Sequence, residues 1–185
     1  MKRATLRCVT NWAAKAADLT ENFSENPAVL PSLLGSDEAA DRMLVFYEES
    51  GREGATFSLH FGDMRGQPLY AVSLYPERAR RSTGNAFSAR ILQLFITDNL
   101  DLLADSRCSV GLWYNEDEDV TYRDIIAALP DRQEAMTLAL RYDQIAIFDL
   151  LNLNEIETGG TGNIPSDIPP AADRLPQMNQ QEEQL

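Results

Sequence analysis

The sequence is poor in the residue types that most often carry enzyme chemistry. Its 185 residues include one histidine, His60, and two cysteines, Cys8 and Cys108, which form no CxxC pair. Any Ser-His-Asp or Cys-His mechanism would have to use His60, and a metal site built from several histidines is excluded. We therefore predict no metal site and no cofactor, and His60 is the single candidate for a catalytic acid or base.

Long apolar runs are also missing. No stretch approaches the roughly 18 apolar residues that a membrane-spanning helix needs. The N-terminus begins with basic residues but contains no continuous apolar stretch, so we expect no signal peptide. Without such a signal we expect a cytoplasmic protein with no membrane contact, in which both cysteines are reduced thiols.

Positive charge is scarce, and lysine occurs only twice. The chain has 16 basic and 29 acidic residues, which gives a net charge of −13. The acidity extends through residues 41–156, which hold 11 basic and 19 acidic groups. Such a field repels nucleic-acid backbones and anionic lipid, and it favours a basic protein partner. We expect no direct nucleic-acid binding; mimicry of a nucleic acid, or a charge that serves only solubility, are the alternatives.

What the sequence does contain is a series of short β-rich runs. These are residues 43–49, 55–61, 69–75, 108–114, 120–126 and 144–150. The first three follow one another closely, which predicts an antiparallel meander, because parallel neighbours need a longer crossover. The fourth and fifth predict a second hairpin. The last is apolar on both faces and predicts an interior strand.

Two segments have the apolar spacing of helices, near 86–98 and after Asp131. In the second, Asp131 and Glu134 have the spacing of a capping box. The resulting order is βββ-α-ββ-α-β. We predict an α+β fold, with a largely antiparallel sheet of about six strands and two helices packed on one face.

Composition divides the chain into three parts. Residues 1–42 are helical or irregular, with an alanine-rich stretch at 12–23 and a brief helix that starts near Ser36. Residues 43–157 form the α+β domain. Residues 158–185 are rich in proline and glycine and poor in apolar side chains, which predicts a disordered acidic tail.

The densest positive patch lies in the stretch LYAVSLYPERARR, residues 69–81. Pro76 ends the β-rich run, and Arg78, Arg80 and Arg81 follow in what we expect to be an exposed loop. Guanidinium groups match the geometry of phosphate and carboxylate, so these three arginines are the candidate anion-binding site. The alternative is that they pair with neighbouring acids, which contributes little.

Three further motifs give weaker indications of a functional site. The acidic run at 115–119 lacks EF-hand spacing and predicts a charged hairpin tip. The GGTG run at 159–162 is not followed by the lysine of a phosphate-binding loop. Asp124 and Asp149 would form a carboxylate pair if the fold brought them together, although capping a loop is the default role.

The sequence therefore favours a non-enzymatic interaction or regulatory protein, which offers an acidic surface or its tail to a protein partner. The alternative is a small enzyme or ligand-binding module for an anionic, phosphate- or carboxylate-bearing molecule. In that case Arg78, Arg80 or Arg81 would position the anion, and His60 would act as the acid or base.

Overall fold

The computed structural model describes residues 34–175; residues 1–33 and 176–185, the latter being the end of the predicted tail, lie outside the described range. The alanine-rich stretch at 12–23 and Cys8 therefore lie outside the described residues. The described helices are α2 (Ser36–Glu49), α3 (Ala89–Asp98), α4 (Leu100–Leu103) and α5 (Arg132–Arg141), with short 3-10 helices η1 (Pro76–Arg78) and η2 (Ala171–Asp173).

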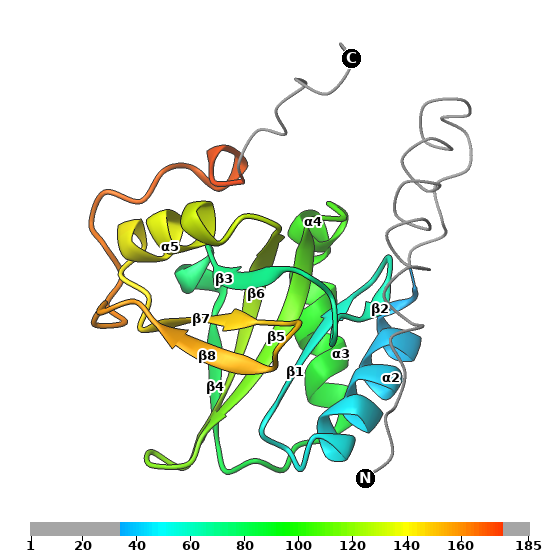
Figure 1. The fold of residues 1–185 in the computed structure, drawn as a ribbon. Coiled ribbons are helices and arrows are strands. Elements are labelled where there is room, and N and C mark those ends of the chain that lie inside the picture. The colour runs from blue at the N-terminus through cyan, green and yellow to red at the C-terminus, as the bar shows by residue number, and fades with distance from the viewer. Residues whose placement is uncertain (1–33, 176–185) are drawn as a thin grey trace, which may run out of the picture. The chain divides into compact units, whose positions relative to one another are not determined.

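The strands form one curled sheet (Figure 1). They are β1 (Gly54–Ser58), β2 (Gly62–Asp63), β3 (Tyr70–Ser73), β4 (Arg80–Thr83), β5 (Cys108–Asn115), β6 (Val120–Leu129), β7 (Ala146–Asp149) and β8 (Asn154–Glu157). Their order is β2-β1-β5-β6-β3-β7-β8, with β4 also paired to β6, and every strand pairing is antiparallel. The predicted α+β class with a largely antiparallel sheet is confirmed, with eight strands instead of about six.

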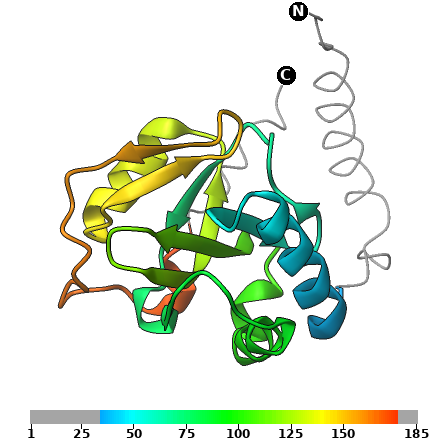
Figure 2. The same cartoon turned by 90° about the horizontal axis from the view of Figure 1, so that it is seen from below.

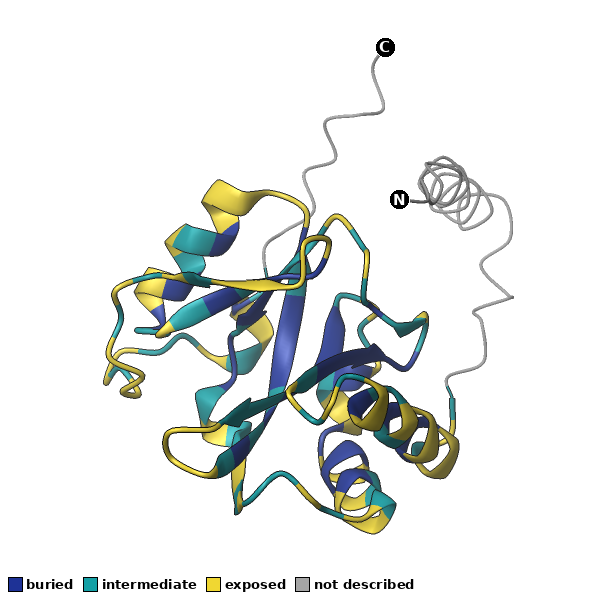
Figure 3. Cartoon of the chain, turned by 60° about the horizontal axis from the view of Figure 1, so that its bottom comes forward, coloured by how far each residue is buried: buried dark blue, intermediate teal, exposed yellow. Residues whose placement is uncertain are grey.

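The α-helices bury their apolar sides against the same face of the sheet. Alternate strand residues point to this face, and they pack with side chains of all four α-helices in a core that includes Met43, Leu92, Leu103 and Ala139. Buried positions run along the central strands and one side of the helices (Figure 3). The opposite face has a smaller apolar cluster built by strands and loops, with no helical residue among the described members.

Residues 43–49 were predicted as a strand, and this is wrong because they form the second half of α2. The buried residues of α2 are Ala39, Ala40, Met43 and Tyr47, which recur at helical spacing. Val45, which a strand would place on the same face as Met43, is 53% exposed. The unbroken apolar run from Met43 to Tyr47 hides this period when it is considered without residues 36–42.

The predicted meander is wrong, because residues 43–49 are helical and the strands within 55–61 and 69–75 do not pair with each other. β1 pairs with β2 and β5, but β3 pairs with β6 and β7 on the other side of the β5–β6 hairpin.

The predicted hairpin of β5 and β6 and the predicted helices α3 and α5 are confirmed. At the start of α5, the Asp131 side chain accepts a hydrogen bond from the Glu134 backbone N–H at 2.7 Å. Strand β7 lies between β3 and β8, as an interior strand should. Seen from below, β7 and β8 lie beside α5, at the other end of the sheet from α2 (Figure 2).

The stretch after Pro76 is largely exposed, as predicted, but the prediction that it is a loop is wrong. After the short helix η1 the chain resumes pairing as β4, with Arg80 opposite Arg123 and Thr83 opposite Val120. Both β3 and β4 therefore pair with the same edge of β6. The pairing is interrupted only from residue 74 to residue 79, a stretch that contains Pro76 and the short helix η1.

Residues 158–175 were predicted as part of a disordered tail, and they are ordered instead. The Thr161 backbone N–H donates to Asp143 Oδ1 at 2.8 Å, and Gly162 donates to the Asp143 carbonyl at 2.7 Å. A Cβ at Gly160 would collide with the backbone carbonyl of Gln144, so glycine is needed there. The segment is held by hydrogen bonds and by close approach of its backbone to residues 143–144. The disorder prediction considered only the low content of apolar side chains, so it did not include these contacts.

Candidate functional site

Arg78, a predicted anion-binding residue, is bonded within the fold. Its Nη2 contacts Asp101 Oδ2 at 2.8 Å, and its Nη1 donates to the Asp98 carbonyl and to Asn99 Oδ1, both at 3.4 Å. These acceptors lie at the C-terminal end of α3 and at the start of α4. Arg78 therefore joins η1 to this helix end, where a positive charge also complements the helix dipole.

Arg80 and Arg81 point to opposite faces because they are neighbours on β4. Arg80 Nη1 donates to the carbonyls of Ala79 at 2.9 Å and Arg78 at 3.2 Å. The Arg81 guanidinium lies 4.9 Å from the centre of the Tyr122 ring, a cation–π contact. The structure thus does not bring the three predicted guanidinium groups to one point.

His60 follows β1 and is partly buried. Its ring lies 6.0 Å from that of Phe61, and its buried Nε2 has no hydrogen-bond partner among residues 34–175. Ser58 Oγ accepts from the backbone N–H of His60 at 3.1 Å, so this serine caps the turn and is not paired with the imidazole. No group of three or more His, Cys, Asp and Glu side chains in the described range is arranged to hold a metal ion.

Cys108 is completely buried at the start of β5. Burial raises the pKa of its thiol to about 11, with a smaller contribution from the charge of Asp105. A thiol with such a pKa is protonated at neutral pH and is a poor nucleophile. A Cys-His mechanism gains no support from this geometry.

Asp124 and Asp149 lie on opposite faces of the sheet. Asp149 is on the face of the helix-covered core, and its Oδ1 accepts from the backbone N–H groups of Leu151 and Asn152 at 3.0 Å, which is the loop-capping role. Asp124 points to the other face, opposite Gly111 of β5. Burial raises the pKa of Asp124 to about 6, and the charges of Arg81 and Arg123 oppose this rise only in part.

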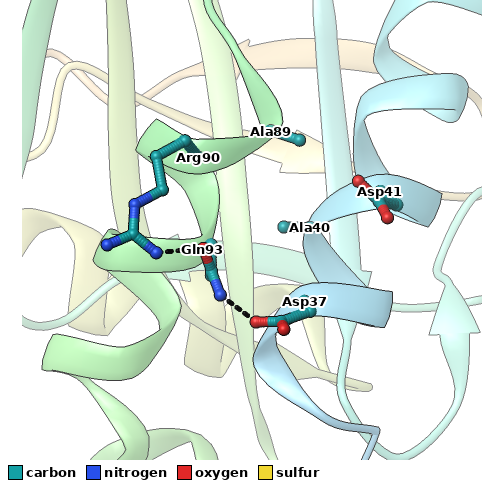
Figure 4. A pocket seen from close by; sticks show the side chains of 6 residues that line it. All are labelled: Asp37, Ala40, Asp41, Ala89, Arg90 and Gln93. Carbon is teal, nitrogen blue, oxygen red and sulfur yellow. Dashed lines mark hydrogen bonds between the residues drawn. The ribbon is translucent and has the colours of Figure 1, made fainter.

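A shallow depression of about 240 Å³ lies between α2 and α3 (Figure 4). It is lined by Asp37, Ala40, Asp41, Ala89, Arg90 and Gln93. Gln93 links the two helices, because its Nε2 donates to Asp37 Oδ1 and its Oε1 accepts from Arg90 Nη1 at 2.5 Å. The small side chains of Ala40 and Ala89 leave the space open. Asp41 stands apart from this chain of bonds (Figure 4).

The helices around the depression expose both acidic and apolar side chains. Val45, Ile91 and Leu94 are 53%, 38% and 46% exposed. Residues 34–175 contain 24 acidic and 12 basic side chains, and ion pairs among them neutralise well under half of the acids. We call the outer sides of α2 and α3 around the depression, with Asp37, Asp41, Val45 and Leu94, the α2–α3 surface.

Sequence reasoning missed this surface because it assigned half of α2 to a strand. The available signal was the spacing of Asp37 and Asp41, which lie one helical turn apart in a segment that begins at Ser36. The position of α3 beside these two residues follows from tertiary contacts, such as the hydrogen bond that Gln93 of α3 donates to Asp37.

Within residues 34–175, none of the helices combines the length and apolar character needed to cross a membrane. Comparison of the chain with family models, curated proteins and solved structures finds no match.

Proposed function

We propose that this is a non-enzymatic interaction protein, cytoplasmic as its sequence indicates, which binds a basic protein partner through the α2–α3 surface. One observation carries the proposal: two carboxylates, Asp37 and Asp41, line a depression between two helices whose outer sides expose apolar side chains. The surrounding negative charge would attract a basic partner over a distance, and the apolar groups would hold it after contact.

The chemistry of the depression suits a lysine or arginine side chain. The aliphatic stem of such a residue can rest on Ala40 and Ala89 while its charged head meets Asp41 and Asp37. A partner segment that carries basic and apolar residues on one helical face would also cover Val45 and Leu94. This is the known mode in which an amphipathic helix lies on a complementary surface.

The alternative of an anion-binding module has less support. It requires guanidinium groups that are gathered at one place to receive a ligand. Instead, Arg78 and Arg80 donate hydrogen bonds within the chain, and Arg81 lies over the Tyr122 ring on the other face of β4. Docking through the proline-rich tail also loses support, because residues 158–175 already make contacts with the fold.

We expect the double variant Asp37→Asn/Asp41→Asn to bind a basic amphipathic helical peptide about 2- to 30-fold more weakly than the native chain. This range corresponds to the loss of two exposed charge pairs. Fluorescence anisotropy of a labelled peptide measures the effect. Binding by the native chain should weaken as sodium chloride rises from 50 to 300 mM, because salt screens exposed charges.

The matched control is Glu155→Gln/Glu157→Gln, which removes the same charge from β8. This strand is the edge of the sheet opposite β2, so it lies far from α2. We expect the control to retain nearly native affinity. Equal losses in both double variants would mean that only net charge matters, and absence of binding at 50 mM salt would refute the proposal.

A further inference from the structure

A short C-terminal segment, residues 168–175, lies over the body of the fold, and we call it the strap. Its apolar side chains Ile168, Ala171 and Leu175 pack at the margin of the main core. Arg174 is the one buried residue of the strap, at 9% exposure, although arginine is seldom buried. The strap therefore has one charged anchor and a few apolar contacts.

The anchor fits a socket made by the end of β3 and by η1. Arg174 Nη1 donates to the Leu74 carbonyl at 3.0 Å and to both carboxylate oxygens of Glu77 at 2.8 Å. Its guanidinium carbon lies 5.3 Å from the centre of the Tyr75 ring. The socket thus offers a carboxylate, a carbonyl and an aromatic face, which together match a guanidinium group.

The backbone of the strap is not tied to the sheet. Among the described residues, its backbone-to-backbone hydrogen bonds are local, from Asp173 to Pro170 and from Arg174 to Ala171. Beyond the apolar packing, the bonds that join it to the body come from the side chain of Arg174. A segment held in this way can detach without breaking any strand pairing, so its opening costs less than global unfolding.

Beneath the strap lies a second depression, of about 170 Å³. The body contributes Tyr75, Asp101, Leu102, Asp105, Arg107 and Cys108, and the strap contributes Ala171, Ala172 and Leu175. The Arg107 side chain forms an ion pair with Asp105 at 2.6 Å, which keeps the polar part of this depression in a fixed arrangement. The strap is thus one wall of a groove that extends from the socket to the buried thiol.

We propose that the strap is an intramolecular ligand which occupies a peptide-docking groove, and that the groove accepts an arginine-bearing, proline-containing segment of a partner protein. The strap shows which chemistry fits: an arginine in the socket, a leucine directly after it and two prolines upstream. While it is attached, the strap competes at an effective concentration of roughly millimolar, so the groove is closed to weak ligands. The groove shares no residue with the α2–α3 surface, and either site can fail without the other.

The test uses the full-length chain, a labelled synthetic peptide with the sequence of residues 166–175, and fluorescence anisotropy. We expect Arg174→Ala to release the strap and to bind this peptide at least tenfold more tightly than the native chain does. The same peptide with alanine in place of its arginine should not bind. Asp173→Ala, an exposed neighbour in the strap, is the matched control and should behave as the native chain.

A second variant separates release of the strap from loss of the fold. Glu77→Gln weakens the socket itself, so it should free the strap and yet bind the peptide poorly. In a Cys8→Ser background, a thiol reagent should label Cys108 several-fold faster in both Arg174→Ala and Glu77→Gln than in the native chain. Equal peptide binding by the native and Arg174→Ala chains, no binding to Arg174→Ala, or unchanged labelling of Cys108 would overturn the proposal.

Discussion

Met43→Ala is expected to lower the free energy of unfolding by about 2–5 kcal/mol, the usual cost of truncating a buried large side chain. Met43 has 0% exposure and packs in the core between α2 and the sheet. Urea denaturation gives the value, and an unchanged m-value would show that the denatured state is not altered.

Val45→Ala is the matched control, because its effect on stability differs between the helix in the structure and the strand predicted for residues 43–49. In a strand, residues 43 and 45 share a face and both substitutions would be costly. In α2, Val45 is 53% exposed, so its change to alanine should alter stability by less than about 0.5 kcal/mol. Comparable losses for Met43→Ala and Val45→Ala would contradict the helical assignment of residues 43–49.

Asp124→Asn is expected to stabilise the protein at pH 7 by about 1–3 kcal/mol relative to the native chain. The folded state raises the pKa of Asp124 from 3.8 to about 6, so between these pH values the folded chain binds more protons than the unfolded chain. Stability from this group is therefore greatest below about pH 4, and it falls as the pH rises towards and through 6. Two pKa units correspond to about 3 kcal/mol, which sets the upper limit.

Other carboxylates have a lowered pKa and therefore stabilise the fold at neutral pH. The effect of Asp124 is thus isolated by subtracting the stability of the native chain from that of Asp124→Asn at each pH. Arg107 lowers the pKa of Asp105, and this contribution to stability is present at neutral pH and lost in acid. We expect the stability gain of Asp124→Asn over the native chain to be near zero at pH 4 and to grow as the pH approaches 7. Asp117→Asn, at the exposed hairpin tip, should give no such gain. A gain of the same size at pH 4 and pH 7 would contradict the proposed burial of an ionised carboxylate.

The parts of the fold that the sequence predicts correctly are those set by local spacing. The hairpin of β5 and β6 has its turn residues and both strands within 22 residues, and α5 carries its own cap at Asp131. The neighbours of β3 could not be predicted in this way, because its partners β6 and β7 lie far along the chain. Strands β4 and β8 are short and polar, so they give little apolar alternation to detect.

The candidate sites depend still more on tertiary structure. Nothing near Asp37 in the sequence indicates that Gln93 will bond to it, and nothing near Arg174 indicates a socket about a hundred residues earlier. The sequence predicted a site at Arg78, Arg80 and Arg81 because these three charges lie within four residues of one another. Strand alternation then separates Arg80 from Arg81, and Arg78 turns towards Asp101.

The most direct test of the proposed function is residue-level mapping by NMR, in which an unlabelled basic amphipathic helical peptide is titrated into the labelled full-length chain. If the proposed function is correct, the largest chemical-shift changes will occur at α2 and α3, centred on Asp37, Asp41, Arg90 and Gln93, and they will shrink at high salt. Shifts that concentrate instead at the acidic hairpin tip, residues 116–119, or that spread evenly over the acidic surface, would contradict it.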